Sequence, residues 1–225
     1  VIINKIPLRL VKSNPGERGR TGEVILFEYS FKAMGSPCQL KCYLPQEGCQ
    51  QHIASLVQQE VERLEAKYSR YRPDSFLNQV NDSAGSNKAI KLDPESSALF
   101  NFAHQAYLQS DGLFDLTSGS LGQVWDFKSA SPPDLAKIPE CLKQVGWHKV
   151  KLTKDEIHIP AAKMRLDLGG IVKEYAADRC ITILKQHGIN NGLIDLGGDI
   201  AVSGSLPGGE GWMIGISDPQ SPDKA

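Results

Sequence analysis

Residues 165–173 read RLDLGGIVK and form the strongest local signal in the sequence. A buried strand predicted over Met164–Leu168 ends in a glycine pair that feeds a helix predicted over Val172–His187. Glycines at such a junction let a phosphate approach the backbone, and the N–H groups at the start of the helix meet it with a favourable dipole. The stretch predicts either a phosphate site or, equally well, a tight strand–helix turn.

Charged side chains flank this glycine pair. Lys173 lies in the first helical turn, where its ammonium group adds a point charge for a phosphate. Asp167 lies at the end of the strand, where its carboxylate is able to accept from a ligand amide or hydroxyl. A solvated lysine beside an ordinary turn explains the same residues. The pattern is not GxGxxG, so the dinucleotide fingerprint is absent.

The letters DLGG recur at 195–198 and are followed by Asp199. Aspartate is rarely buried unless it is paired, hydrogen-bonded or bound to a metal, so two such aspartates before glycine pairs are unusual. For this second copy we favour a capped turn, with Asp199 in a structural role.

The other predicted elements alternate irregularly between strands and helices. Strands are expected over Val24–Phe31, Cys38–Leu44, Lys149–Thr153, Glu156–Ile159 and Gly192–Leu196, the third and fourth as a hairpin. Helices are expected over about 49–68 and from an N-cap at Asp93 to near residue 111. Residues 1–22 are expected to form a flexible arm, and 128–139 a surface loop. This pattern indicates an α+β or mixed α/β fold.

Two further segments carry groups suited to a ligand. Residues 113–121, LFDLTSGSL, place a carboxylate and hydroxyls in a loop, which suits a polar heterocycle but is also ordinary turn chemistry. Tyr71, within SRYRPDS at 69–75, is able to stack on an aromatic ligand. A helix stop with an interfacial tyrosine, followed by a short helix capped by Asp74 or Ser75, explains that stretch as well.

Composition and missing motifs exclude several classes of protein. The 225 residues carry 25 basic and 26 acidic side chains. The sequence therefore lacks the excess of basic residues that is typical of nucleic-acid-binding proteins. The apolar runs are far shorter than a membrane span. HExxH, GxSxG and zinc-type Cys/His spacings are absent. Five cysteines without a pairing pattern, and no visible signal, favour a cytoplasmic location, with a periplasmic, inner-membrane-associated one as the alternative.

The order of these segments is more specific than any one of them. From about residue 27 to 219 the chain resembles the successive motifs of the ApbE family of flavin transferases. The matching motifs include MGS at 34–36, SxYxxDS at 69–75, GLFD at 112–115, LDLGGIVK at 166–173 and LGGD at 196–199. The resemblance implies an ApbE-like flavin transferase fold, with an FAD-binding domain over 23–225.

The resemblance also implies a set of site residues, although it assigns no catalytic residue. The side chains implied to contact FAD are Met34, Ser36, Tyr71, Leu113, Phe114, Asp115, Asp167 and Lys173. Ser36 stands where the family usually has threonine, and Glu174 where it has glycine. The carbonyl of Gly170 would help to hold Mg²⁺, which would bridge the pyrophosphate and neutralise the leaving AMP.

The implied activity is transfer of FMN from FAD onto a threonine hydroxyl of a partner flavoprotein. Three alternatives stay open: an FAD pyrophosphatase giving FMN and AMP, a non-catalytic FAD-binding module, and an ordinary domain with tight glycine turns. Family members continue past the position of Ala225 with segments that complete the Mg²⁺ site. We therefore expect the C-terminal part of the domain to be missing here, through truncation or degeneration.

Overall fold

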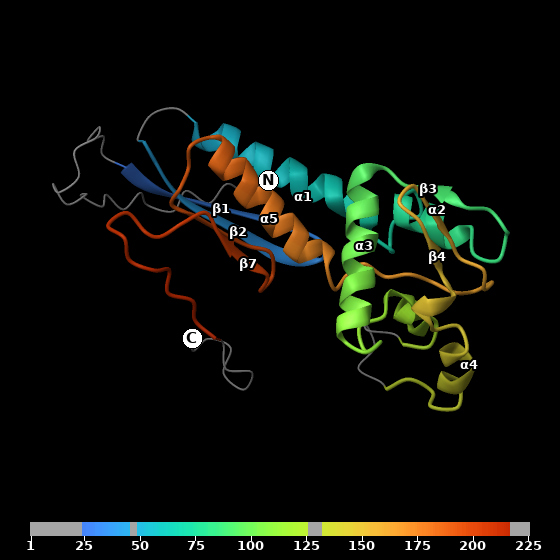
Figure 1. Ribbon diagram of the computed structural model, residues 1–225. Coiled ribbons are helices and arrows are strands. Elements are labelled where there is room, and N and C mark those ends of the chain that lie inside the picture. The colour runs from blue at the N-terminus through green and yellow to red at the C-terminus, as the bar shows by residue number, and fades with distance from the viewer. Residues whose placement is uncertain (1–23, 46–48, 126–131, 217–225) are drawn as a thin grey trace. The chain divides into compact units, whose positions relative to one another are not determined.

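The computed structural model describes residues 24–45, 49–125 and 132–216 (Figure 1). The chain divides into two compact units, the first comprising residues 1–61 and 174–225 and the second residues 62–173. The arm predicted at 1–22 and the start of the loop predicted at 128–139 lie outside the described ranges. The single domain predicted over 23–225 stays a prediction.

An antiparallel sheet forms the first unit, with the strand order β1-β2-β6-β7. Its strands are β1 (Val24–Ala33), β2 (Ser36–Pro45), β6 (Gly192–Asp195) and β7 (Ile200–Val202). The first two confirm the strands predicted there. They meet in a two-residue turn at Met34 and Gly35, whose φ angles are 51° and 72°. Positive φ at both turn residues matches the twist of paired strands, so the turn fixes the register of the hairpin.

Two helices, α1 (Gln50–Tyr68) and α5 (Val172–Gln186), confirm the amphipathic patterns. Within the first unit they run beside the sheet (Figure 1), and Arg179 of α5 donates to Glu60 of α1 over 2.9 Å. The core of this unit contains the alternate β2 side chains, as predicted, with apolar residues of both helices. Buried members are Cys38, Leu40, Cys42, Leu44, Val57, Ala176, Cys180 and Leu184. All five cysteines are free thiols.

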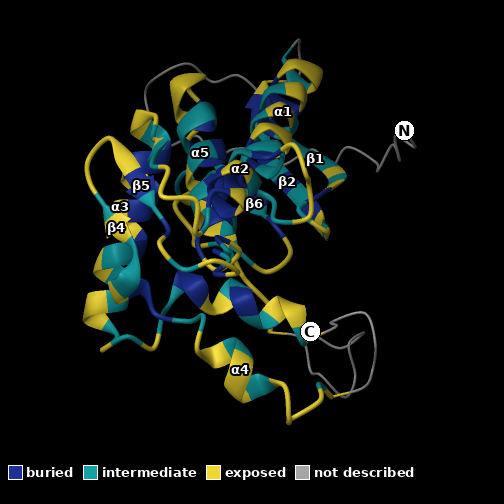
Figure 2. Cartoon of the chain, turned by 90° about the vertical axis from the view of Figure 1, so that its right-hand side faces the viewer, coloured by how far each residue is buried: buried dark blue, intermediate teal, exposed yellow. Residues whose placement is uncertain are grey.

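The second unit is built mainly from helices, of which α3 (Pro94–Gln109) is the longest. The others are α2 (Phe76–Asp82), η1 (Leu116–Gln123), α4 (Ile138–Leu142) and η2 (Trp147–Lys149). The side chain of Ser75 caps α2 by accepting from Asn78 N over 3.0 Å, and that of Asp93 caps α3 by accepting from Ser96 N over 2.9 Å. Both caps were predicted. α4 begins within the predicted surface loop and has no buried residue, as its yellow and teal colouring shows (Figure 2).

A small antiparallel sheet completes the second unit, in the order β3-β5-β4. Its strands are β3 (Ile90–Lys91), β4 (Lys151–Leu152) and β5 (Glu156–His158). β4 and β5 confirm the predicted hairpin, although both are shorter than expected. Phe100 of α3 stacks on Trp147 with ring centroids 6.5 Å apart, and both side chains are buried. No helix among the described residues combines the length and apolarity needed to cross a membrane.

The strand predicted over Met164–Leu168 is wrong, because this segment joins no sheet. Its side chains still alternate as in a strand, with Met164, Leu166 and Leu168 buried. The backbone groups of the segment bond instead to the side chains of Asn81 and Ser120 and to one carbonyl of η1. Alternation reports burial of one face, but it does not identify the hydrogen-bond partner.

An ion-pair cluster fastens the end of α1 to the start of α3. Glu95 accepts from Arg63 over 2.6 Å and from Lys67 over 2.8 Å, and Lys67 also pairs with Asp93 over 2.8 Å. The hydrogen bond from Arg63, and after it those from Lys67, lower the pKa of Glu95 to about 2, although partial burial opposes the shift.

This depressed pKa predicts an acid-sensitive contribution to stability. Because the folded-state pKa of Glu95 lies below its ordinary value of 4.5, the cluster stabilises the fold above pH 4.5 and loses that contribution as the pH falls towards 2. When the free energy of unfolding is measured with urea across this pH window, it is expected to change less steeply with pH for E95Q than for the unaltered chain. E140Q is the control, since Glu140 pairs with Lys143 on the surface, where ion pairs contribute little. Equal slopes for E95Q and the unaltered chain would contradict the prediction.

Candidate functional site

The segment leading to the glycine pair is held by partners from elsewhere in the second unit. Asn81, which is 2% exposed, accepts from Leu166 N over 2.7 Å and donates to Leu166 O over 3.1 Å. Ser120 Oγ accepts from Arg165 N over 3.0 Å, and Leu116 O accepts from Asp167 N over 2.9 Å. This set of bonds fixes the position of Asp167.

The glycine pair itself forms a turn capped by Asp167. Asp167 Oδ1 accepts from Gly169 N over 2.8 Å, which is the geometry of an aspartate turn. Gly169 and Gly170 are both exposed. A Cβ on Gly170 would lie 3.2 Å from Cε2 of Phe114, so that ring lies against the glycine. The capped turn is therefore present, and its backbone remains open on one side to a ligand.

The second DLGG copy closes the hairpin between β6 and β7. Asp195 Oδ1 accepts from Gly198 N over 2.7 Å, and Leu196 N donates to Asp199 O over 3.0 Å. Gly197 and Gly198 have φ values of 74° and 102°, which favour glycine, whereas neither glycine of the first copy has positive φ. The second copy is a capped turn as expected, with a different backbone geometry from the first.

Asp115 caps η1, and residues 116–121 lie in that helix rather than in a loop, which corrects the prediction for the later part of 113–121. Its Oδ1 accepts from Thr117 N over 2.7 Å and from Thr117 Oγ1 over 2.6 Å, and its Oδ2 accepts from Trp147 N over 3.0 Å. Thr117 Oγ1 accepts in turn from Gly146 N over 2.7 Å. The Asp115 carboxylate therefore joins η1 to η2. Its implied contact with FAD stays a prediction.

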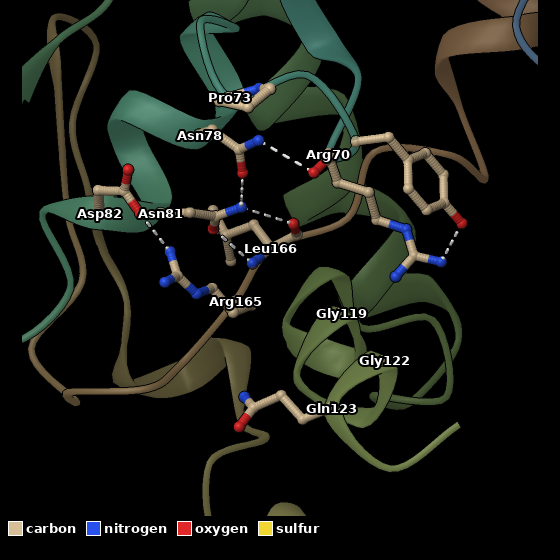
Figure 3. Close-up of a pocket in the computed structure, with 11 residues that line it drawn as sticks. Arg70, Pro73, Asn78, Asn81, Asp82, Gly119, Gly122, Gln123, Arg165 and Leu166 are labelled. Atoms are coloured by element: carbon tan, nitrogen blue, oxygen red, sulfur yellow. Dashed lines mark hydrogen bonds and ion pairs between the residues drawn. The ribbon is translucent and has the colours of Figure 1, made fainter. Parts of the chain in front are cut away.

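A pocket of about 410 Å³ lies between α2, η1 and the 165–166 segment (Figure 3). Its lining residues are Arg70, Tyr71, Pro73, Asn78, Asn81, Asp82, Gly119, Gly122, Gln123, Arg165 and Leu166. In Figure 3, Arg70 lies to one side of the Asn81–Leu166 contact, and Arg165, paired with Asp82 over 2.7 Å, lies to the other. A volume of this size suits a small ligand.

Arg70 connects two of the predicted site residues. Its Nε lies 3.0 Å from Asp167 Oδ2, its Nη2 donates to the Tyr71 hydroxyl over 2.6 Å, and its Cζ lies 4.6 Å from the centroid of the Tyr71 ring. The sequence gives no signal for the pairing of Arg70 with Asp167, because the two residues are far apart in the chain.

The predicted residues fall into both units. Met34 and Ser36 belong to the β1–β2 hairpin of the first unit. The second unit brings Tyr71 to Asp167 through Arg70, and Phe114 to Gly170. The remaining members are Leu113, which is 91% exposed, Asp115 at the start of η1, and Lys173 in the first turn of α5.

The described residues do not by themselves make a magnesium site. Among them, no group of three or more His, Cys, Asp or Glu side chains is placed to hold a metal ion. The Gly170 carbonyl would supply one oxygen, and the nearby Asp167 carboxylate already pairs with Arg70 and Gly169 N. Mg²⁺ in proteins is usually held by one or two carboxylates together with waters and substrate phosphates, so one carbonyl beside a carboxylate that is already paired falls short of such a site.

Comparison with solved structures defines the class of protein. A flavin transferase ApbE from Vibrio cholerae superposes with a TM-score of 0.78 at 22% identity, over 87% of this chain and 65% of that one. An ApbE protein from Thermotoga maritima gives a TM-score of 0.78 at 27% identity, over 88% and 65% of the two chains. The fold is therefore a mixed α/β flavin transferase fold, as the sequence predicted.

The chain belongs to the ApbE family, whose model matches residues 34–225. It is 32% identical over 198 residues to an FAD:protein FMN transferase of Klebsiella pneumoniae, covering 86% of this chain and 59% of that protein. It is 28% identical over 226 residues to an FAD:protein FMN transferase of Treponema pallidum, covering 91% of this chain and 61% of that protein. The chain thus spans about three fifths of the length of these relatives.

Proposed function

We propose that this protein transfers FMN from FAD onto a threonine hydroxyl of a partner flavoprotein in a Mg²⁺-dependent reaction. The observation that carries the proposal is the exposed turn at Gly169 and Gly170, which has Asp167 at its start and Phe114 against its second glycine. Membership of the ApbE family, and the relatives named FAD:protein FMN transferase, support the same activity.

The proposed reaction is a phosphoryl-type transfer. The threonine oxygen attacks the phosphorus of the FMN half of FAD, and the bond from that phosphorus to the bridging oxygen breaks. AMP leaves with the bridging oxygen, and the hydroxyl proton is released. Protein groups contribute to such a transfer chiefly by positioning the reactants and stabilising charge.

The chain's own residues are proposed to bind and orient the nucleotide. The start of α5 is the positive end of its helix dipole and therefore favours anionic groups, and Lys173 in its first turn adds positive charge there. The ring of Tyr71, which is 74% exposed, is available for stacking. Mg²⁺ would supply charge neutralisation at the pyrophosphate when bound, but we assign no step to it because the described residues offer it too few ligands.

The test combines the chain with FAD, Mg²⁺ and a candidate acceptor flavoprotein. Covalent labelling of the acceptor that fluoresces under ultraviolet light, together with release of AMP, is the expected result. FMN and AMP without labelling would show hydrolysis instead, and bound FAD without turnover would show a binding module. If FAD changes neither its fluorescence nor the melting temperature of the protein, the flavin proposal is wrong.

Replacing Tyr71 separates nucleotide binding from folding. Because Tyr71 is 74% exposed, Y71A is expected to leave the melting temperature almost unchanged, while loss of one stacking surface weakens FAD binding about tenfold, which corresponds to roughly 1.4 kcal/mol. Titration of FAD against both proteins, with calorimetric melting, checks both parts. L135A is the control, since Leu135 is also 74% exposed but lies outside the candidate site. A large loss of stability in Y71A would make Tyr71 structural.

A further inference from the structure

We infer that Arg70 is a positioning residue for the flavin nucleotide, acting through Tyr71 and Asp167. The inference rests on the proposed function, since both of those residues are proposed nucleotide contacts. Neither the SxYxxDS motif at 69–75 nor the names of the relatives assign a role to Arg70. Its guanidinium contacts both of these side chains, through the ion pair with Asp167, the hydrogen bond to the Tyr71 hydroxyl and the stacking on the Tyr71 ring.

Arg70 restrains the exposed ring of Tyr71. With 74% of its surface exposed, Tyr71 has little packing to restrict its rotation. The Arg70 guanidinium covers one face of the ring, with Cζ 4.6 Å from the centroid, and also donates to the hydroxyl over 2.6 Å. A guanidinium stacks on an aromatic ring in this way by cation–π attraction. The contact holds the ring in one orientation and leaves its other face for a ligand.

Arg70 also restrains the Asp167 carboxylate. Its Oδ1 caps the glycine turn through Gly169 N at 2.8 Å, and its Oδ2 pairs with Arg70 Nε at 3.0 Å. The two oxygens are therefore fixed by different partners. Arg70 sets the rotation of the carboxylate, and through it the orientation of the Gly169 N–H group.

Arg70 is itself held by neighbouring residues. A Cβ on Gly122 would lie 2.6 Å from Arg70 Nη1, so the guanidinium lies directly against that glycine of η1. The backbone carbonyl of Arg70 also accepts from Asn78 Nδ2 over 2.9 Å. Arg70 thus has a defined place between α2 and η1. A side chain ordered before binding lowers the entropic cost of ordering the residues it contacts.

The test is FAD binding by the whole chain with Arg70 replaced. R70Q is expected to weaken FAD affinity about tenfold, and R70K to recover only part of it, because an ammonium does not stack and bridge as a guanidinium does. R72Q is the matched control: Arg72 lies in the same turn and pairs with exposed Asp74, but does not line the pocket. It is expected to bind FAD within about twofold of the unaltered chain. Melting temperatures of all variants verify folding.

A mutant cycle distinguishes positioning from direct contact. In a Y71A/D167A background, adding R70Q is expected to weaken FAD binding by less than about twofold, since the residues through which Arg70 acts are gone. A full tenfold loss in that background would mean that Arg70 contacts the nucleotide itself and would overturn the inference, as would normal binding by R70Q alone. Failure of the unaltered chain to bind FAD would refute the proposed function as well, so the two failures are distinguishable.

Discussion

N81A is expected to destabilise the protein by about 3 kcal/mol, because it leaves a buried N–H and a buried C=O without their partner. Asn81 is 2% exposed and makes both hydrogen bonds of Leu166, which is 1% exposed. Alanine can replace neither bond, and the cavity it leaves adds to the cost. Urea unfolding at neutral pH measures the change, which is a large fraction of the stability of a typical domain.

A matched asparagine provides the control for this result. Asn101 is exposed, and its Nδ2 donates locally within α3, to Ser97 O over 2.9 Å and to Ser97 Oγ over 3.4 Å. N101A is expected to cost less than about 1 kcal/mol. If N81A costs no more than N101A, water reaches the backbone of Leu166, and the two Asn81 hydrogen bonds do not hold the 164–168 segment. FAD binding by N81A should fall as well, because Asp167 directly follows Leu166 and loses its fixed position when the Leu166 backbone is released.

G119A is expected to cost about 3 kcal/mol, and for a steric reason alone. A Cβ at residue 119 would lie 2.7 Å from Arg165 O, 2.8 Å from Leu166 C and 2.9 Å from Asp167 N, all of which are backbone atoms that are unable to move aside singly. The φ of Gly119 is not positive, and alanine is otherwise the better helix former, so neither backbone strain nor helix propensity opposes the substitution. The steric clash alone therefore makes G119A destabilising.

G122A, in the same helix η1, is the control for G119A. Its Cβ would meet only the far end of the Arg70 side chain, which is able to shift by rotating about its own bonds, as the backbone atoms facing Gly119 are not. The expected loss of stability is below about 1 kcal/mol. Thermal unfolding of the two variants gives the comparison. Equal stabilities for G119A and the unaltered chain would show that the 165–167 backbone is free to retreat from η1.

Elements with strong periodicity and clear caps could be predicted from the sequence. The β1–β2 hairpin, α1 and α5 follow from alternation or from helical spacing, and α3 follows from its Asp93 cap. These signals are local, because the same residues that form the pattern also form the element.

Elements that depend on distant partners could not be predicted. η1 contains glycine and serine, which disfavour a helix, and its start is held by Asp115 together with η2. The backbone partner of Leu166 is a side chain far along the sequence, so a strand pattern there gave the wrong element. For the site, motif order led to Asp167 and Tyr71, but the side chain that joins them is visible only in three dimensions.

The mode of attachment of the 164–168 segment has a consequence for how this part of the protein tolerates changes in length. Ser120, Asn81 and Leu116 each bind one successive residue of the segment, and Met164, Leu166 and Leu168 face inward. An insertion or deletion of a single residue would turn the apolar row outward and mismatch all three attachments at once. Length variation among homologous sequences should therefore fall outside this segment, although a surface turn beside it accepts such changes readily.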